Sequence, residues 1–374
     1  MMRIHRFTFL LASLFLSLVA VAQESGTVFN FLNLPVSSHS AALGGKNISL
    51  MEDDISLPMQ NPALLSNISD KSVGFSFMTY MQGTNTGAAA YSQHVGANGS
   101  WGVHAQFVGY GSTKETLVTG EMVGDFSPMD LCVAGQYSHI LSNHWVGGVT
   151  AKFIYSHYGP YTSCALAADL GLNYYSEKSD FSFSVAARNL GGQIKSFGNE
   201  RDPLPVDLEM GFTKSLGHAP IRISVTMVDL TRWTSDDYFT TGNKVKAGSI
   251  LINHFVLGAE WLITNKFYVG LGYNFRRAYE MNAAGSSHAA GLSFGGGVPF
   301  QPFQGNLCLA DALLGLGLGS PDTSVPGQVQ FAPEGMLHMA VTLVDFLKIA
   351  LNLGIIGMGD GMMAHWKILL LLVS

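Results

Sequence analysis

The sequence predicts an all-β protein, a transmembrane antiparallel β-barrel with a short N-terminal plug segment. Charged residues make up 12% of the 374 residues, about half the ~25% of an ordinary soluble chain, while Gly (43), Phe (23) and Tyr (13) are abundant. Between Phe75 and Phe294 no run of about 18 apolar residues offers a transmembrane helix. Apolar and polar residues alternate with period two in the same region, which indicates strands with two different faces.

The N-terminus has the features of a secretory signal peptide, residues 1–22. A basic region, an apolar stretch and a small-x-small cleavage site follow one another: Arg3 to Arg6, Phe7 to Val21 and Ala20 to Ala22. An uncleaved anchor helix is the alternative, but the apolar stretch is short for one. Removal of Arg3 and Arg6 would change the formal charge from −6 to −8, and an acidic chain is poorly suited to binding nucleic acid.

The clearest alternating run places Phe181, Phe183 and Val185 on one face, and Ser182, Ser184 and Arg188 on the other. Similar runs cover residues 101–107, 145–153, 255–263 and 267–276. Many runs reach about nine to eleven residues, the length that a tilted strand needs to cross hydrocarbon, whereas soluble strands average about five or six. Aromatic residues gather at the ends of runs, as in an interfacial girdle: Tyr80, Tyr110, Trp145, Tyr155, Tyr174, Tyr175 and Tyr268. A soluble β-sandwich or a periplasmic barrel is the alternative.

Short polar joints separate the runs, as at residues 97–99, 142–144, 177–180 and 264–266. Joints of two to five residues make neighbouring strands antiparallel hairpins. In lipid every backbone amide needs a partner within the protein, so this meander must close on itself. We therefore expect residues 71–299 to form the barrel.

Residues 23–70 lack sustained alternation and mix apolar and acidic residues with proline and glycine. We interpret this segment as a plug in the mouth of the barrel, with a periplasmic tail as the alternative. The longer polar stretches 195–205 and 234–246 are expected to be outward loops, and docking surfaces are placed at 199–207 and 235–246.

Motifs spread over roughly residues 26–298 resemble the PorV/PorQ group of outer-membrane barrels, PorQ-like members most of all. The residues that carry the resemblance are Ala41, Ala42, Leu43, Gly44, Gly45, Asp53, Asp54, Asn61, Pro62, Ala63, Arg188, Asn189, Leu190, Gly191, Gly192, Leu204, Pro205, Gly258 and Glu260. They are expected to be structural. The resemblance implies a FadL-like barrel of about fourteen strands.

The same resemblance implies a function in the type IX secretion system of Bacteroidota. The barrel would tether a PorZ-like surface protein near a PorU-like sortase and a PorV-like barrel, where cargo is processed and joined to lipopolysaccharide. A FadL-like transporter of hydrophobic small molecules is the second candidate function. Both place the mature chain in the outer membrane of a Gram-negative bacterium.

Residues 300–374 differ from the rest because alternation stops and Tyr and Arg are absent. A frameshift near residue 300 would explain this, and a genuine appended segment is the alternative. The chain ends in Leu371 to Ser374 rather than in the terminal aromatic residue expected of a bacterial barrel.

No motif in the sequence indicates an enzyme, a metal site or a cofactor. The histidines are dispersed and form no HExxH pattern. In Ser138-His139 the two side chains of a strand would point to opposite faces, so they cannot form a nucleophile and its base. Ser287-His288 is excluded in the same way. The three cysteines, Cys132, Cys164 and Cys308, form no CxxC pair. We predict a protein without catalytic residues.

Overall fold

The structure, a computed structural model, describes residues 26–79, 84–116, 122–198, 200–238, 245–264, 267–283, 288–297 and 307–309. The chain divides into two compact units, Met1–Pro321 and Asp322–Ser374, and every described residue belongs to the first. The predicted signal peptide and nearly all of the tail after residue 300 lie outside the described residues. Both, with the domain boundaries that depend on them, stay predictions.

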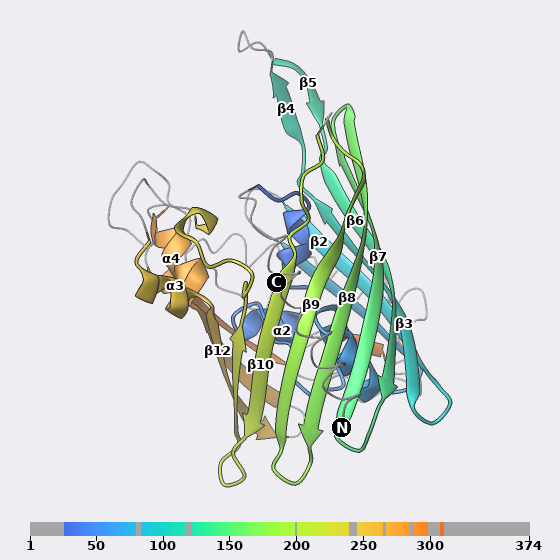
Figure 1. Ribbon diagram of the computed structural model, residues 1–374, viewed down its shortest axis with the longest axis vertical. Helices are drawn as coiled ribbons and strands as arrows, with labels where there is room; N and C mark the ends of the chain where they lie inside the picture. Colours follow the sequence, from blue (N-terminus) through green and yellow to red (C-terminus); the bar gives the residue numbers. More distant parts are fainter. Residues whose placement is uncertain are drawn as a thin grey trace, which may run out of the picture. The chain divides into compact units, whose positions relative to one another are not determined.

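One large antiparallel sheet curls into the wall of a β-barrel (Figure 1). Its thirteen strands follow the order β14-β13-β12-β11-β10-β9-β8-β7-β6-β3-β2-β1-β15. The strands are β1 (Ser72–Thr79), β2 (Asn85–Val95), β3 (Gly99–Gly109), β6 (Met129–Ile140), β7 (Trp145–Tyr158), β8 (Tyr161–Ser176), β9 (Phe181–Lys195), β10 (Asp207–Ser215), β11 (Ile221–Met227), β12 (Phe255–Thr264), β13 (Phe267–Asn274), β14 (Leu292–Gly297) and β15 (Leu307–Leu309). Among the described residues no backbone pairing joins β14 to β15.

The predicted all-β, antiparallel barrel is thus confirmed, with twelve strands in antiparallel order in the described part against the expected fourteen or so. The strand β15 was not expected, because alternation cannot be recognised over three residues. It pairs with β1 in parallel, with Val73 opposite Leu307. The predicted strand that ran through Arg276 ends at Asn274 instead, and a helix follows. The amide oxygen of Asn274 accepts a hydrogen bond of 2.9 Å from the backbone nitrogen of Arg277, which caps that helix.

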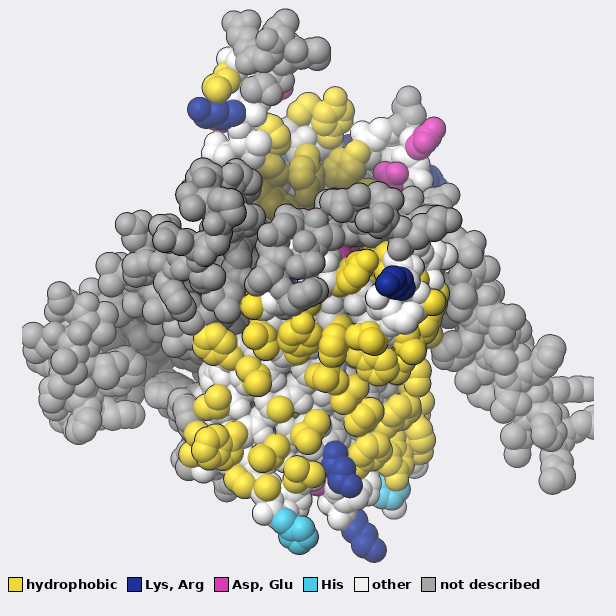
Figure 2. Space-filling model, turned by 90° about the vertical axis from the view of Figure 1, so that its left-hand side faces the viewer, with side chains coloured by type: hydrophobic (Ala, Val, Ile, Leu, Met, Phe, Trp, Pro, Cys, Tyr) yellow, Lys and Arg dark blue, Asp and Glu magenta, His cyan; other side chains and the backbone are white. Residues whose placement is uncertain are grey.

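The two faces of the wall have opposite chemistry. Inward positions carry polar side chains that are buried, among them Gln136, Lys152, Asp169, Asn173, Arg188, Glu209, Arg222 and Glu260. Outward positions carry large apolar side chains that are exposed, among them Phe107, Val133, Val149, Phe153, Leu166, Leu170, Phe212, Ile223, Leu257, Trp261, Ile263 and Leu271. Figure 2 shows the outer face of one side of the wall covered by apolar side chains. A soluble sheet has the reverse arrangement.

The segment before β1 fills the interior of the barrel, as predicted for a plug. It contains α2 (Ser38–Ala42) and three short 3-10 helices, η1 (Asn30–Asn33), η2 (Leu57–Met59) and η3 (Pro62–Asn67). Leu43, Leu50, Leu57 and Leu64 pack together as an apolar core of its own. We call residues 27–70 the plug.

Longer excursions lie at the opposite end from the short hairpin turns (Figure 1). A separate hairpin of β4 (Thr113–Thr116) and β5 (Met122–Phe126) projects beyond the wall between β3 and β6. A lobe of η5 (Ser235–Asp237), α3 (Ala247–Asn253), α4 (Phe275–Ala283) and η6 (His288–Gly291) stands above β11 to β14. Within the described ranges, every helix is too short or too polar to be a candidate membrane span.

Candidate functional site: the contact between plug and wall

The plug approaches the wall most closely where the wall carries glycine. A Cβ added to Gly272 of β13 would lie 2.1 Å from the backbone nitrogen of Gly44, at the end of α2. A Cβ added to Gly148 of β7 would lie 2.4 Å from the carbonyl carbon of Pro62. No side chain fits at either place, so these glycines let plug and wall backbones touch. Gly44 also has a φ of 102°, which a residue with a side chain rarely adopts.

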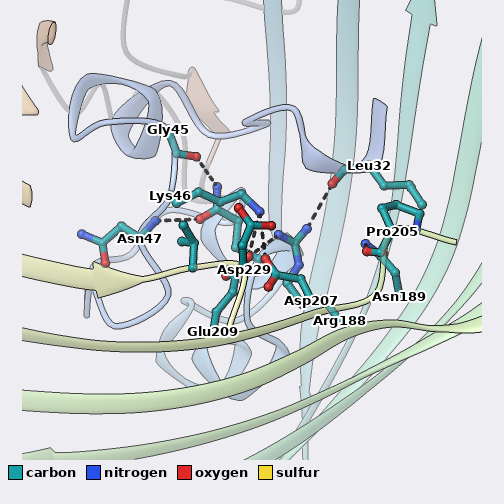
Figure 3. Close-up of polar contacts among 12 residues, drawn as sticks. Leu32, Gly45, Lys46, Asn47, Arg188, Asn189, Pro205, Asp207, Glu209 and Asp229 are labelled. Carbon is teal, nitrogen blue, oxygen red and sulfur yellow. Dashed lines mark hydrogen bonds and ion pairs between the residues drawn. The ribbon is translucent and has the colours of Figure 1, made fainter. Parts of the chain in front are cut away.

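Lys46 of the plug enters a buried group of charges, which we call the Lys46 cluster (Figure 3). Its Nζ lies 2.7 Å from Oε1 of Glu209 and 3.9 Å from Oδ2 of Asp207, both on β10. Arg188 of β9 lies 3.1 Å from the same Glu209 oxygen and donates a 3.3 Å hydrogen bond to the carbonyl oxygen of Leu32. The Glu209 carboxylate therefore holds a plug cation and a wall cation together.

The hydrogen bonding of this cluster is incomplete. Oδ1 of Asp207 and Oε2 of Glu209 are buried and have no hydrogen-bond partner among the described residues. Buried carboxylate oxygens without donors are costly, because the local dielectric is low. The cluster binds the plug, yet part of its bonding capacity is unused.

A β-bulge directs the two consecutive side chains of Arg188 and Asn189 into the lumen. The register between β8 and β9 shifts between Ala168 and Leu170, and both Arg188 and Asn189 are buried. Asn189 has a φ of 57°, a conformation that asparagine adopts more readily than most residues. A bulge of this kind re-aims side chains that plain alternation would point apart.

Asn189 then joins three parts of the wall. Its backbone nitrogen donates to Oδ1 of Asp169 at 2.8 Å, and its Nδ2 donates to the carbonyl oxygen of Pro205 at 2.9 Å. Its Oδ1 accepts from Nζ of Lys152 at 2.9 Å, and Lys152 also pairs with Asp169 at 2.6 Å. Strands β7, β8 and β9 and the loop after β9 are tied together at this point.

A second ionic group joins the plug to the other side of the barrel. Arg222 of β11 donates to both oxygens of Glu260 on β12, at 2.7 and 3.2 Å, and its Nη1 contacts Glu52 of the plug. His39 of α2 contacts Glu260 as well and stacks on Tyr268 with a centroid distance of 4.0 Å. Since buried ion pairs are costly to break, this group and the Lys46 cluster act as two clamps on the plug.

Hydrogen bonds from acidic and amide side chains hold the plug in shape. Asp54 accepts from the Ser37 hydroxyl at 2.9 Å and from the backbone of Ser56 at 2.9 Å. Asn61 caps η3 by accepting from the backbone of Ala63 at 3.1 Å and donates to the carbonyl oxygen of Ile48 at 2.8 Å. In the same way, Asp53 accepts from the backbone nitrogen of Ser69 at 2.7 Å and so closes the plug before β1.

An apolar layer interrupts the otherwise polar lumen near the end that carries the longer loops. The wall contributes small and apolar side chains from β3, β6, β7 and β8 to this layer: Val108, Cys132, Ile154, Ala165 and Ala167. The plug fills it with Phe29, Phe31 and Leu32, and Leu204 from the loop after β9 closes it. We call this set the apolar layer.

Aromatic residues and one carboxylate form a rim above the apolar layer. Asp130 accepts hydrogen bonds from the hydroxyls of Tyr110 at 2.6 Å and Tyr158 at 3.0 Å. Burial, followed by the hydrogen bond to Asp130, raises the pKa of Tyr110 well above its usual range. Phe197 meets Tyr158 edge to face at 5.5 Å and lies 6.2 Å from Phe29.

A small cavity lies between the plug and the first two strands. It measures about 10 Å³ and is bordered by Ile55 and Met59 of the plug and by Phe75 of β1 and Ala90 of β2. This volume suits about one water molecule, not a ligand.

The structure places the predicted motif residues mostly along the contact of plug and wall. Leu43 is buried beside Gly258, whose added Cβ would lie 3.1 Å from the Leu43 Cβ. Gly191 follows the bulge, where an added Cβ would lie 2.0 Å from the Leu166 carbonyl oxygen. Gly45 has a φ of 95°, and its carbonyl oxygen accepts a 3.4 Å hydrogen bond from Nε2 of Gln60 within the plug. Whether the motif marks a family stays a prediction.

Sequence reasoning missed several residues of the site: Lys46, Glu52, Lys152, Asp169, Asp207, Glu209 and Arg222. A signal was present, because most of these are charged residues at the inward positions of strands in a chain with few charges. Alternation shows that they face the lumen, but not which of them meet.

The described part of the chain contains no group of three His, Cys, Asp or Glu residues placed to hold a metal ion. Ser138 is buried and its neighbour His139 is exposed, in agreement with the expected opposite faces of that strand. Cys132 is buried in the apolar layer, and Cys164 is half-buried. Ser287 lies outside the described residues.

The two segments expected to be docking loops are partly folded into the protein. Leu204 and Pro205 are buried, and Asp207 belongs to the Lys46 cluster, so residues 200–202 are the exposed ones among the described residues of the first segment. In the second, Tyr238 and Val245 are buried in the core of the lobe, while residues 239–244 lie outside the described residues. The expected loops are less exposed than predicted because they bury Leu204 and Asp207 in the barrel, and Tyr238 and Val245 in the lobe.

No protein-family model matches the chain, and no curated protein matches it. Similar solved structures include the toluene transporter TbuX of Ralstonia pickettii, with 13% identity over 72% of this chain and 90% of that chain, at a TM-score of 0.44. The toluene transporter TodX of Pseudomonas putida has 11% identity over 71% of this chain and 89% of that chain, at a TM-score of 0.46. A Pseudomonas aeruginosa FadL homologue has 11% identity over 72% and 87%, at a TM-score of 0.39.

Proposed function

We propose that this chain is a non-enzymatic outer-membrane barrel of a Gram-negative bacterium that lets a hydrophobic small molecule pass when the plug rearranges. The observation that carries the proposal is the apolar layer, where the inward side chains of the wall are themselves apolar and meet apolar side chains of the plug. Elsewhere the inward side chains of the wall are mostly polar and hold the plug through hydrogen bonds and ion pairs.

The occupants of the apolar layer indicate what it would bind. Phe29, Phe31 and Leu32 of the plug fill it in the closed state. Their withdrawal would cost on the order of 1.5–3 kcal/mol for each side chain exposed to water. An apolar ligand that takes their place would offset this cost, so hydrophobic molecules would favour the open state.

The plug must be able to move for passage to occur, and a reversible cross-link tests this. The hydroxyls of Ser49 in the plug and Thr213 in β10 lie 2.8 Å apart and are buried. Because the two hydroxyl oxygens are in contact, Ser49→Cys with Thr213→Cys is the pair chosen to form a disulfide between plug and wall. The native Cys132, Cys164 and Cys308 would be replaced by serine or alanine first.

Cells that make this variant would be tested with N-phenyl-1-naphthylamine, an apolar dye that fluoresces in membranes. We expect the oxidised variant to take up the dye at least about fivefold more slowly than the reduced one, with Thr213→Cys alone as the control that oxidation leaves unchanged. Equal uptake by the oxidised and reduced variants would contradict passage through a movable plug.

A second candidate function is a scaffold of the type IX secretion attachment complex in Bacteroidota, on the resemblance described above. The β4–β5 hairpin favours a docking role, because it projects from the barrel and exposes apolar side chains, with Met122 64% exposed. Deletion of residues 113–126 separates the two functions. On the scaffold hypothesis the deletion would abolish recovery of PorZ-like, PorU-like and PorV-like partners with the tagged protein, while dye uptake persists.

A further inference from the structure

The side of the barrel formed by β11 to β14 is short. β11, β13 and β14 have 7, 8 and 6 described residues and β12 has 10, whereas β7, β8 and β9 have 14, 16 and 15. A tilted strand needs about 9 to 11 residues to cross the hydrocarbon layer. If the barrel spans a membrane, as its proposed function requires, β12 is long enough to cross the hydrocarbon, while the described parts of β11, β13 and β14 leave room on this side for another lipid-facing element.

Helix α3 stands where this short side ends, and its exposed face carries no polar residue. Its exposed residues are Ala247, Gly248, Leu251 and Ile252. They share one face because Leu251 and Ile252 lie four positions after Ala247 and Gly248, about one helical turn further along. None of the four is polar. Leu251 and Ile252 are 49% and 51% exposed.

The opposite face of α3 contacts the protein and includes a polar residue. Ile250 packs with Tyr238 and Val245, and Tyr279 of α4 packs against them. Asn253, which is polar, is buried. A helix at a water surface would place its polar residues outward, as in an ordinary amphipathic helix.

Ion pairs and a cation–π contact hold the rest of the lobe together, so α3 is held in one orientation. Arg276 of α4 pairs with Asp229 at 2.9 Å and with Glu280 at 2.9 Å, and its guanidinium lies 4.6 Å from the centre of the Tyr238 ring. The chain then passes from α3 into β12, whose outward residues Leu257 and Trp261 belong to the apolar outer face of the wall.

We propose that Ala247, Gly248, Leu251 and Ile252 contact the acyl chains of membrane lipid, so that α3 extends the lipid-facing surface above β11 to β13. Trp233 of the same lobe is exposed and donates from Nε1 to the carbonyl oxygen of Leu230, an arrangement suited to the interface between lipid and water.

The experiment places single nitroxide labels on the full chain, in the background without native cysteines, reconstituted into phosphatidylcholine vesicles. The labelled variants are Leu251→Cys and Ile252→Cys, with Leu257→Cys as the control on the wall and Asp202→Cys as the control in water. Collision rates with oxygen, which partitions into lipid, and with a water-soluble nickel chelate are measured by electron paramagnetic resonance.

We expect the labels at 251 and 252 to match the label at 257, with an oxygen-to-nickel collision ratio at least about tenfold above that at 202. If 257 lies in lipid and both 251 and 252 collide freely with nickel, the inference about α3 is overturned while the proposed membrane location stands. If 257 also collides freely with nickel, the membrane location itself fails.

Discussion

At the scale of single residues, the plug depends on charges that are buried in pairs. Arg222 contacts Glu260 of the wall and Glu52 of the plug, and Glu209 contacts Lys46 of the plug and Arg188 of the wall. Removal of one partner from such a pair leaves a buried charge without compensation, which costs about 3–5 kcal/mol. Removal of both partners costs less. The ion pairs therefore set where the plug sits more than they add to stability.

Arg222→Met tests this claim. We expect it to lower the free energy of unfolding by about 3 kcal/mol, somewhat less than the full range because Glu52 is partly exposed to water. The double variant Arg222→Met with Glu260→Gln should be more stable than the single variant, because it removes a buried carboxylate that has lost its two bonds from Arg222 and keeps only the contact with His39. Urea unfolding in detergent micelles measures both. Additive losses in the double variant would show that the pair does not interact.

His254, which directly follows α3, makes the stability of the lobe depend on pH. It is fully buried, its Nδ1 lies 2.7 Å from the carbonyl oxygen of Val228, and its ring lies 4.2 Å from that of Trp233. Burial lowers the pKa of His254, so the folded state keeps it neutral. The unfolded chain protonates it near pH 6.5, so its contribution to stability is complete above that pH and is lost as pH falls towards the folded pKa.

We expect the free energy of unfolding to decrease between about pH 6.5 and 5 more steeply for the wild-type chain than for His254→Gln. The difference between the two chains isolates this residue from the other titrating groups. Hydrogen exchange of residues 245–255 over the same pH range reports the lobe directly. Parallel pH profiles for the two chains would refute the assignment.

At the scale of elements, period-two alternation sufficed to predict β3, β7, β9 and β12, because each has one apolar and one polar face. It did not suffice for α4, since Phe275 and Arg276 continue the alternating pattern and only the cap from Asn274 starts the helix. The bulge at Asn189 could not be predicted either, because the conformation of one residue decides it. For the site, the sequence indicated lumenal charges but not their partners, which lie up to 221 positions apart, as His39 and Glu260 do.

The fit of the plug against β13 depends on Gly272. We expect Gly272→Ala to displace α2, because the added Cβ would lie 2.1 Å from the backbone of Gly44. Residues 27–70 should then become sensitive to trypsin, whereas we expect the wild-type plug to resist cleavage at Lys46, whose side chain is 12% exposed. Gly135→Ala on β6 is the matched control, since its Cβ would meet nothing within 4 Å. Equal resistance of the two variants to cleavage would show that the close approach is not required.

At the scale of the whole molecule, the inner and outer faces of the wall assign it to two different solvents. The inward side chains of the wall are mostly polar and contact the plug, and the outer face exposes apolar side chains along the described strands from β1 to β14. In water such a surface would drive aggregation, since monomeric soluble proteins rarely expose large contiguous apolar patches. In hydrocarbon the same surface is stable, and strands whose backbone groups are paired with their neighbours, as β1 to β14 are, suit that solvent.

Quenching of Trp261 by lipid tests this central claim most directly. The chain would be folded into vesicles whose acyl chains carry bromine, which quenches tryptophan only at contact distance. Trp261 is 58% exposed on the outer face of β12. We predict that bromolipid quenches a component of the emission that Trp261→Phe lacks, and that iodide in the water does not reach it. If iodide quenches Trp261 and bromolipid does not, the outer face of the wall is in water and the account is wrong.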